Sequence, residues 1–494
     1  MKQLISSTFF TDKRRIFALK IVFLIVIGAL AYLFAQSAGD GKLFIHHEDE
    51  VIYYCSGKLF AETGSVQAEG CIEEMVSAIG SMNWYGPGYS VIYGLLTKVF
   101  GEAPARLIQF HFGFALIALL VILTFPTSLE KRLSIAIALV LTEQFTLYIF
   151  TYFPETLIIL LAVVLTFFLY QAHEAKENKV RNYYLAGFAL VTLLASLCRV
   201  TCIFWLAALM GLAHNRRSFV VMTLIFLLGV LAAMVYMKFF TAPAYASDMQ
   251  KIELLYTFDI YEFQKQTFNS IARGFRELIG SGSLSVYILL ALTLIASALY
   301  FRTRNKLVLS ATLVSWCLIF VLTAFYTVTP YYFIKQTAML VPLLLTAVLA
   351  TAPPALAYSV LASLLACLPG ALQHTIDTIE ERREAYVKYN EYVTFRKALA
   401  QIPEYVQEEG TVILWCYNEF GYGNSTESLL PFSTRAGKPI MYTSNIVDPS
   451  VSQDIKFKTH NRLTVDYILS AEALSGDSLK EVHVTEFYHL YKLR

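Results

Sequence analysis

The chain has 494 residues, of which 56% are hydrophobic and only 15% are charged, and its formal net charge is +2. A soluble protein could not bury so large a share of apolar side chains, so this composition excludes a soluble globular protein and predicts an integral membrane protein. The nearly balanced charge gives no indication of nucleic acid as a partner.

The predicted fold is an all-α polytopic membrane protein, because eleven segments are apolar enough to cross a bilayer. A spanning helix needs about 20 apolar residues, and shorter ones are tolerated in thin or buried settings. Two of the eleven, 182–197 and 201–215, are short and could instead form one long kinked span. The eleven predicted spans are 16–36, 104–126, 132–150, 154–172, 182–197, 201–215, 219–240, 284–301, 307–326, 331–350 and 355–372.

Basic residues mark one side of the predicted membrane. They cluster before the first span and in alternate connections after it, and the positive-inside rule makes this side cytoplasmic. A single span over 182–215 would break the alternation, so two spans are predicted there. The N-terminus is then cytoplasmic, and it is not expected to be a cleaved signal peptide because no small-residue cleavage site follows its apolar segment. The basic clusters are Lys13, Arg14 and Arg15; Lys131 and Arg132; Lys176, Lys179 and Arg181; Arg216 and Arg217; and Arg302, Arg304 and Lys306.

Two long loops, 37–103 and 241–283, are predicted on the extracytoplasmic side. The first contains "EDEVIYYCSGKLFAE", whose apolar residues share one face of a helix that would lie along the membrane surface. It ends in "NWYGPGYSVIYGLLTKVFG", an apolar stretch that is broken by glycine and proline and is expected to be re-entrant or interfacial. The second loop is polar with a helical middle. Cys55 and Cys71 share the first loop, where they could form a disulfide if the loop is extracytoplasmic.

The C-terminal residues 373–494 are predicted to form a small extracytoplasmic α/β domain beyond a transmembrane module of residues 1–372. A long amphipathic helix comes first, with apolar side chains near three-to-four spacing, and segments that read as strands follow it. The four predicted strands are "TVILWC", "KPIMYT", "LTVDYIL" and "HVTEFYHLY".

Five charged or histidine residues, within the spans or at the turn between two of them, all approach the extracytoplasmic face. An ionised side chain near the bilayer centre costs roughly 2.5–3.5 kcal/mol, so each needs a reason. Each also has a structural explanation: acids at 48–50 suit a helix start, and the others suit packing, pairing or a position at the headgroups. Together, their common depth predicts a polar cavity open to the outer leaflet, beside Asp49 and Glu50. These residues are His111, Glu143, Glu155, Arg199 and Lys335.

Several landmarks follow one another in a fixed order, beginning with the pattern D-E-x-x-Y at 49–53. After it come Gly64, "GPGYSVIYGLLTKVFG", Ala105-Arg106-Leu107, "YTYFPETLIILL", "LAGFALVTLLASLCRVTCIFW" and "PYYFIKQTAMLVPLLL". In order and sidedness they resemble the GT-C glycosyltransferases, and most closely the group of protein O-mannosyltransferases and lipid A aminoarabinose transferases. The sequence departs from that group in having Glu155 where aspartate is more common and Lys335 where arginine is common, and its C-terminal domain matches only in placement.

The resemblance implies an enzyme that moves a hexosyl or pentosyl group from a polyprenyl-phosphate donor to a hydroxyl of a lipid, glycan or protein acceptor. The transfer would take place at the extracytoplasmic face of a plasma (inner) or endoplasmic reticulum membrane, and direct displacement would invert the anomeric centre. Asp49 would be the general base that takes the acceptor's proton, while Glu50 would orient the acceptor or be a second acid. The donor phosphate would be bound by Arg199, Lys335, Tyr331 and Tyr332.

A divalent cation is a further expectation for this site. Oxygen ligands favour magnesium or manganese. Two histidines would allow zinc, although the fixed spacing H-E-x-x-H is not present. The same residues could serve the acceptor instead of a metal. The candidates for a metal or acceptor site are Glu155, Glu143, His46 and His47, with Asp49 beside them.

Three other functional classes share some of these features. A transporter or flippase for a lipid-linked sugar would need polar groups that continue to the cytoplasmic side and would favour an inverted repeat. An oligosaccharide polymerase or ligase would prefer a pyrophosphate donor and more basic residues in its large outer loop. A non-catalytic scaffold would tolerate Asp49→Asn without a loss of activity.

Overall fold

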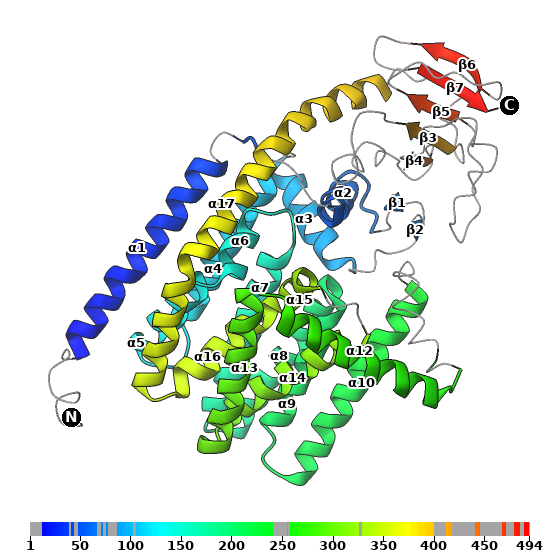
Figure 1. Ribbon diagram of the computed structural model, residues 1–494. Helices are drawn as coiled ribbons and strands as arrows, with labels where there is room; N and C mark the ends of the chain where they lie inside the picture. The colour runs from blue at the N-terminus through cyan, green and yellow to red at the C-terminus, as the bar shows by residue number, and fades with distance from the viewer. Residues whose placement is uncertain are drawn as a thin grey trace.

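The structure, a computed structural model, is mostly helical (Figure 1). Its described residues contain nine helices that are long and apolar enough to cross a membrane, or ten if one bent pair counts as a single span. The chain is therefore a polytopic membrane protein. The structure describes residues 12–38, 41–43, 48–66, 71–72, 76–77, 86–101, 105–240, 254, 257–325, 329–399, 412–416, 440–444, 467–470, 479–484 and 489–493.

Most helices follow one another through short connections, which places neighbours in sequence beside each other in the bundle. The helices are α1 (Asp12–Ala38), α2 (Glu48–Thr63), α3 (Gly88–Phe100), α4 (Arg106–Leu123), α5 (Leu129–Val140), α6 (Glu143–Ile149), α7 (Glu155–Glu174), α8 (Asn178–Cys198), η1 (Val200–Leu206), α9 (Ala207–Gly211), α10 (Arg216–Phe240), α12 (Ile260–Gly280), α13 (Leu284–Thr303), α14 (Lys306–Phe325), α15 (Pro330–Thr337), η2 (Ala338–Leu340), α16 (Val341–Thr351) and α17 (Pro354–Leu399). The bent pair is α5 with α6, which meet at 61°.

The bundle has a central helix that protein covers on all sides and outer helices that are exposed. α16 is apolar around its whole circumference, and every residue from Val341 to Ala350 is buried. α10 is equally apolar but exposes side chains such as Leu224, Leu228 and Leu231. An apolar side chain that protein does not cover faces lipid in a bilayer, so α10 and α1, on opposite flanks of the bundle in Figure 1, lie at its periphery.

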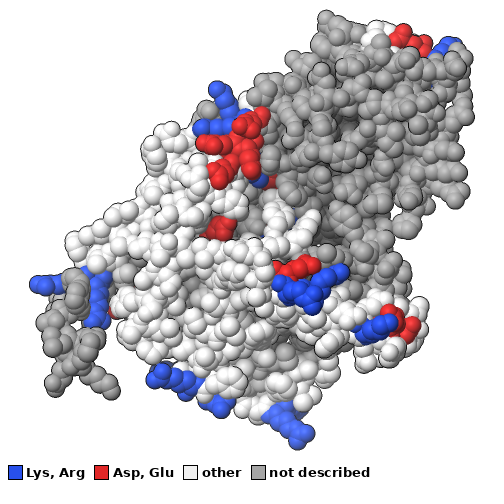
Figure 2. Space-filling model, viewed as in Figure 1, with Lys and Arg blue, Asp and Glu red and all other residues white. Residues whose placement is uncertain are grey.

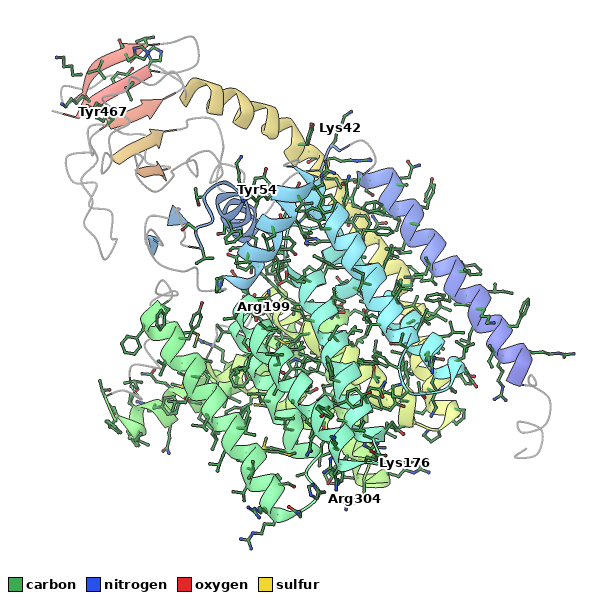
Figure 3. The ribbon with its side chains drawn as sticks, turned by 180° about the vertical axis from the view of Figure 1, so that it is seen from behind. Lys42, Tyr54, Lys176, Arg199, Arg304 and Tyr467 are labelled. Carbon is green, nitrogen blue, oxygen red and sulfur yellow. The ribbon has the colours of Figure 1, made fainter. Side chains whose placement is uncertain are left out.

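Charged side chains gather toward the two ends of the bundle, with a largely uncharged belt between them (Figure 2). The lower end in that view shows only Lys and Arg, whereas the upper end shows acidic and basic residues together. Lys176 and Arg304 lie at one end and Arg199 lies nearer the other (Figure 3). The positive-inside rule assigns the end with Lys176 and Arg304, here called the basic end, to the cytoplasm, and this orientation stays a prediction.

One predicted crossing is shorter than a span. Residues 201–215 form most of η1 and α9, which have only seven and five residues. These helices still return the chain to the basic end, because Lys306 Nζ donates to the carbonyl of Ala213 at 2.9 Å. A 3₁₀-helix rises by about 2.0 Å per residue, so the two helices cover roughly 20 Å in few residues. The described residues therefore hold nine or ten helices of span length instead of the eleven predicted, although the alternation of ends is kept.

The close packing of this short crossing depends on Gly211, at the contact between α9 and α14. A Cβ atom added there would lie 2.4 Å from Ser310 Oγ and 2.6 Å from the Ser310 backbone nitrogen. We expect Gly211→Ala to lower the free energy of unfolding by about 1–3 kcal/mol, because the backbone of α14 would have to move. Thermal unfolding in detergent micelles would measure this. Gly113→Ala is the matched control, since an added Cβ meets nothing within 4 Å there, and equal losses in both variants would contradict the packing argument.

The first of the two long predicted loops contains the helix α2 at the place of the predicted surface helix. The stretch after Gly86-Pro87 forms α3, which packs along α2, where a Cβ on Gly94 would lie 2.8 Å from the carbonyl oxygen of Gly57. A two-residue hairpin pair, β1 (Cys71–Ile72) and β2 (Val76–Ser77), lies between them in sequence. The predicted disulfide lies outside the described residues, since the side chains of Cys55 and Cys71 are not among them. In the second loop, the predicted helical middle is α12.

α17 continues well beyond the membrane-spanning part of the chain and leads to a small sheet (Figure 1). The predicted boundary between residues 372 and 373 falls inside this helix. Five strands form one sheet in the order β4-β3-β5-β7-β6, in which β3 pairs in parallel with β4 and β5, and β7 pairs antiparallel with β5 and β6. The strands are β3 (Val412–Cys416), β4 (Ile440–Ser444), β5 (Tyr467–Ser470), β6 (Leu479–Val484) and β7 (His489–Leu493).

Three of the four predicted strands are confirmed as β3, β4 and β5, and the fourth is wrong in its extent. The segment "HVTEFYHLY", predicted as one strand, contains the end of β6 and the start of β7, which form an antiparallel pair. Its apolar and aromatic residues favour a strand throughout, so composition alone does not reveal the reversal. Parallel neighbours such as β3 and β4 need a crossover connection, and the residues between them lie outside the described part of the chain.

Candidate functional site

Arg199 lies at the point where α8 ends and the short crossing begins. Its backbone is extended, with φ −157° and ψ 115°, and only 3% of the residue is exposed. The glycines of the first loop approach this point closely: a Cβ on Gly86 would lie 2.2 Å from the carbonyl oxygen of Leu197, and one on Gly88 would lie 2.6 Å from Cys198 Sγ. Gly86 also has a φ of +91°, which suits glycine. The Gly-Pro-Gly stretch therefore seats α3 against the residues that precede Arg199.

Arg199 joins two other predicted site residues in one buried cluster. Its Nη2 donates to Glu155 Oε1, and its Nη1 donates to the backbone carbonyl of Lys335 at 3.0 Å. Glu155, in the first turn of α7, and Lys335, near the end of α15, are both fully buried. Thr201, two residues further along, also donates to Gln336 at 3.2 Å. The start of η1 and the end of α15 are thus tied together at this point.

The ammonium group of Lys335 lies over aromatic rings. Its Nζ is 4.2 Å from the centroid of the Phe153 ring, 5.6 Å from that of Tyr53 and 6.0 Å from that of Tyr331. Such cation–π contacts stabilise a buried cation without neutralising its charge. Tyr331 and Tyr332, one turn earlier on α15, are 37% and 38% exposed and pack edge-on against each other. The tyrosine pair is therefore accessible, while the lysine beneath it is not.

Glu50, in the first turn of α2, is held from two directions. One of its oxygens, Oε1, accepts a hydrogen bond from the backbone nitrogen of Tyr152 at 2.9 Å and another from Nη2 of Arg382, on α17. Glu50 is fully buried and Arg382 is 3% exposed. Asp49 precedes Glu50 in α2, and its side chain lies outside the described residues. Glu50 thus ties the start of α2 to the connection between α6 and α7 and to α17.

Glu143 belongs to a separate polar cluster. Its carboxylate accepts a hydrogen bond from Ser285 on α13 and contacts Nδ1 of His374 on α17. Glu155, which was predicted to share a site with Glu143, pairs with Arg199 instead. His111 is fully buried and shares a hydrogen bond of 2.8 Å with Tyr93, between α3 and α4.

A cavity of about 510 Å³ is bordered by the Glu143 cluster and by Arg382, the partner of Glu50. Its walls come from α6, α13, α15 and α17, and most of them are apolar. Charged groups line it at two places, Glu143 with His374 and Glu381 with Arg382. Phe153 and Tyr331 also line it, and the Lys335 ammonium lies over their rings. The cavity can therefore receive an amphipathic molecule, with Arg382 in its wall and the buried Lys335 behind two of its aromatic rings.

Two buried atoms of the Arg199 cluster have hydrogen-bonding capacity left. Within the described part of the chain, neither Glu155 Oε2 nor Arg199 Nε has a hydrogen-bond partner. Burial alone would lower the pKa of Arg199, but the carboxylate of Glu155 outweighs it, so the pKa lies above its ordinary value and the guanidinium stays charged. A ligand or water that meets these atoms would satisfy them.

The metal prediction is not tested by these contacts. Among the described residues, no three His, Cys, Asp or Glu side chains are grouped so that they could hold a metal ion. His46 and His47, two of the predicted ligands, lie outside the described residues, as does the side chain of Asp49.

Sequence reasoning missed three residues that the structure adds to this region. Arg382, Ser285 and His374 complete the contacts of Glu50 and Glu143, and two of them lie on α17. The run "IEERREAY" after the last predicted span contains a signal for Arg382. Arg382 continues the three-to-four spacing of Thr375, Thr378 and Ile379, which are buried, so it belongs to the buried face of the helix. The sequence alone assigns this run only to the start of the C-terminal domain.

No family model and no curated protein matches the chain. Solved structures do match. The crystal structure of ArnT from Cupriavidus metallidurans bound to undecaprenyl phosphate has a TM-score of 0.50 at 11% identity, over 95% of this chain and 97% of that one. The oligosaccharyltransferase of Archaeoglobus fulgidus, in complex with Zn and sulfate, has a TM-score of 0.51 at 12% identity, over 91% of this chain and 68% of that one.

Identities this low show the fold and not the reaction. The similarity nevertheless extends over nearly the whole chain and is found with two different enzymes. The chain has the fold of the GT-C membrane glycosyltransferases.

Proposed function

We propose that the chain is a membrane glycosyltransferase that moves a sugar from a polyprenyl-phosphate donor to an acceptor hydroxyl, with inversion. The observation that carries the proposal is the pair of buried cations, Arg199 and Lys335, in a GT-C fold, because the Lys335 ammonium lies over Phe153 and Tyr331, whose rings line an amphipathic cavity. A buried cation is costly in a membrane protein and marks a functional site by default. The structure of ArnT bound to undecaprenyl phosphate supports a donor of this chemical class.

The cations would stabilise the phosphate as it leaves. In the transfer, the acceptor oxygen bonds to the anomeric carbon while the bond from that carbon to the phosphate oxygen breaks, and the phosphate keeps the electron pair. Negative charge therefore grows on the phosphate, and preorganised donors that face it lower the barrier. Arg199 offers a planar fork with one unused N–H, and Lys335 offers a point charge. Tyr331 lines the cavity, and Tyr331 and Tyr332 are both exposed enough to donate hydrogen bonds.

Asp49 would take the proton that the acceptor hydroxyl loses. Glu50 is fully buried against Arg382 and the Tyr152 nitrogen, which supports an orienting role for it rather than a direct one. Glu50 and Tyr53 are three residues apart and so share a face of α2, and Tyr53 lies near the Lys335 ammonium. This arrangement supports placing the acidic pair beside the phosphate site.

A divalent ion fits part of this site. Glu155 Oε2 is a buried carboxylate oxygen that has no hydrogen-bond partner among the described residues, and it could bind magnesium or manganese together with Asp49 and His46 or His47. Zinc is present in the oligosaccharyltransferase structure and would be held by the same histidines. Such an ion would supply positive charge against the phosphate when bound. Glu143 is better placed for the acceptor, because it lines the cavity.

The proposal also fixes an orientation. The N-terminus and the basic end would be cytoplasmic, and the site, the loops 37–103 and 241–283 and the α/β domain at 373–494 would be extracytoplasmic. The membrane would be a plasma or inner membrane, or that of the endoplasmic reticulum. The acceptor would be a lipid, a glycan or a protein that reaches the cavity from that side.

Binding of undecaprenyl phosphate to the protein in nanodiscs tests the phosphate site without knowledge of the sugar. Arg199→Met combined with Glu155→Gln removes both charges of the ion pair, so the fold does not have to bury an uncompensated carboxylate. We expect this variant and Lys335→Met each to weaken binding roughly 10- to 100-fold, the value of one charge-assisted hydrogen bond. Arg302→Met, an exposed arginine at the basic end, is the matched control and should bind normally.

Undecaprenol, which lacks the phosphate, serves as the control ligand. Wild-type protein that binds the alcohol as well as the phosphate would remove the donor assignment, and so would unchanged binding in both cluster variants.

A further inference from the structure

A second cavity lies at the basic end, where its wall includes His214 and Arg217 from the connection between α9 and α10 and the first turn of α10. Its volume is about 480 Å³, within the range of about 300–1,000 Å³ typical of small-molecule sites. It lies between α8 and α10, with Leu209 of α9 also in its wall. We call it the basic groove, and it is lined by Leu185, Ala189, His214, Arg217, Val221 and Ile225, among others.

The groove is apolar along its length and polar at one end. The apolar side chains come from the facing sides of α8 and α10 and continue into the belt of exposed apolar residues of both helices, which includes Leu193 and Leu228. His214 and Arg217 belong to the connection between α9 and α10 and to the first turn of α10, at the level of the other basic loops. The groove therefore runs from the headgroup level of the membrane into its hydrocarbon region.

The polar end is positively charged. Arg181 reaches it from α8, where its Nη2 lies 3.4 Å from His214 Nδ1. The buried Nε of Arg181 has no hydrogen-bond partner in the described part of the structure. None of the described residues that line the groove is acidic. The nearest acids to Arg181 in sequence are Glu174, which ends α7, and Glu177, which directly precedes α8. A molecule that fits this charge pattern has an anionic head and an apolar chain.

We propose that the basic groove binds one anionic glycerophospholipid. Its phosphate is held by Arg181, Arg217 and His214, and one acyl chain lies between α8 and α10. Basic pockets between membrane helices on the cytoplasmic side commonly bind anionic lipid headgroups. The bound lipid fills the space that the short crossing η1–α9 leaves between its two long neighbours, so it stabilises the segment that carries Arg199 at its other end.

Native mass spectrometry of the full chain in detergent, titrated with phosphatidylglycerol, tests the proposal. We expect Arg181→Gln combined with Arg217→Gln to weaken the first binding event about 30-fold, at the usual contribution of two membrane-facing arginines. Ala186→Phe keeps every charge but fills the groove from an exposed position on α8, and we expect it to weaken binding as strongly. Arg302→Gln combined with Arg304→Gln, at the same end of the bundle, should bind like the wild type.

Two further ligands distinguish a site for a whole lipid from attraction between charges alone. Phosphatidylcholine should bind weakly and inorganic phosphate should not compete, since the site takes head and chain together. Equal losses in the Arg302/Arg304 variant would reduce the effect to general surface charge, and full binding by Ala186→Phe would remove the acyl chain from the groove; either result overturns the proposal. Undecaprenyl phosphate binding at the Arg199 cluster should be unchanged in the Arg181/Arg217 variant, so this site and the proposed function can fail independently.

Discussion

Replacing Arg382 by methionine is expected to lower the free energy of unfolding by about 3–5 kcal/mol, the usual cost of removing one partner of a buried ion pair. Glu50 is fully buried and Arg382 is 3% exposed, so water cannot replace the lost cation. The variant should also loosen α2 from α17, because the pair connects residues 332 positions apart. The midpoint of thermal unfolding in detergent micelles measures the loss.

The double variant Arg382→Met with Glu50→Gln separates the ion pair from simple packing. Glutamine still accepts the hydrogen bond from the Tyr152 nitrogen and carries no charge, so most of the stability should return. Arg383→Met is the matched control, since Arg383 is exposed and bonds only a backbone carbonyl, that of Gln36, among its described contacts. A double variant no more stable than the single one, or an equal loss in the control, would contradict this interpretation.

The pair has a structural consequence for the proposed site. Glu50 follows Asp49 directly in α2, and Arg382 lies on the helix that continues to the C-terminal sheet. A displacement of α17 would therefore act on the acidic pair through a rigid contact. His374, on the same helix, contacts Glu143 across the cavity. α17 thus holds one wall of the cavity and one side of the acidic pair at the same time.

The sequence was sufficient to predict most of the bundle and the common depth of several buried charged residues. Long apolar runs predict spans without any tertiary information, and the charged residues at one depth, Glu155, Arg199 and Lys335, do meet. The short crossing was harder to predict. The residues of η1 and α9 are too few for a lipid-exposed spanning helix, and most of them are buried, so they can cross only where protein surrounds them. Hydropathy measures apolar length, and it does not report whether the neighbour of a segment is lipid or protein.

The contacts of α17 could not be predicted for a different reason. Its periodicity indicates a buried face near Arg382, but periodicity does not identify the partner, which lies 332 residues earlier at Glu50. The same limit applies to Glu143 and Glu155, which were predicted at one depth. Glu143 contacts Ser285 and His374, whereas Glu155 contacts Arg199. Depth along a helix can be predicted from sequence, whereas direction around the helix requires the packing.

Asp49→Asn is expected to lower the rate of sugar transfer roughly 10²- to 10⁴-fold, the usual contribution of a general base. Asparagine has nearly the same shape and still suits the start of α2, but it cannot take the proton of the acceptor hydroxyl. Transfer would be followed with a radiolabelled pool of polyprenyl-phosphate sugars from membranes of the expressing cells, supplied with their own acceptors. Glu48→Gln, which changes the acid one residue earlier, is the matched control and should retain transfer.

The binding of undecaprenyl phosphate decides what a loss of transfer means. A base acts on the acceptor and not on the donor phosphate, so Asp49→Asn should bind the lipid like the wild type while the Arg199/Glu155 double variant should not. Loss of binding in Asp49→Asn would instead assign Asp49 to the donor or to an ion beside it, and full transfer would return the acidic pair to the role of a helix start. Because Glu50 is held by Arg382 and Asp49 is the proposed base, the two variants should differ: Glu50→Gln should lower stability, and Asp49→Asn should lower the rate of transfer.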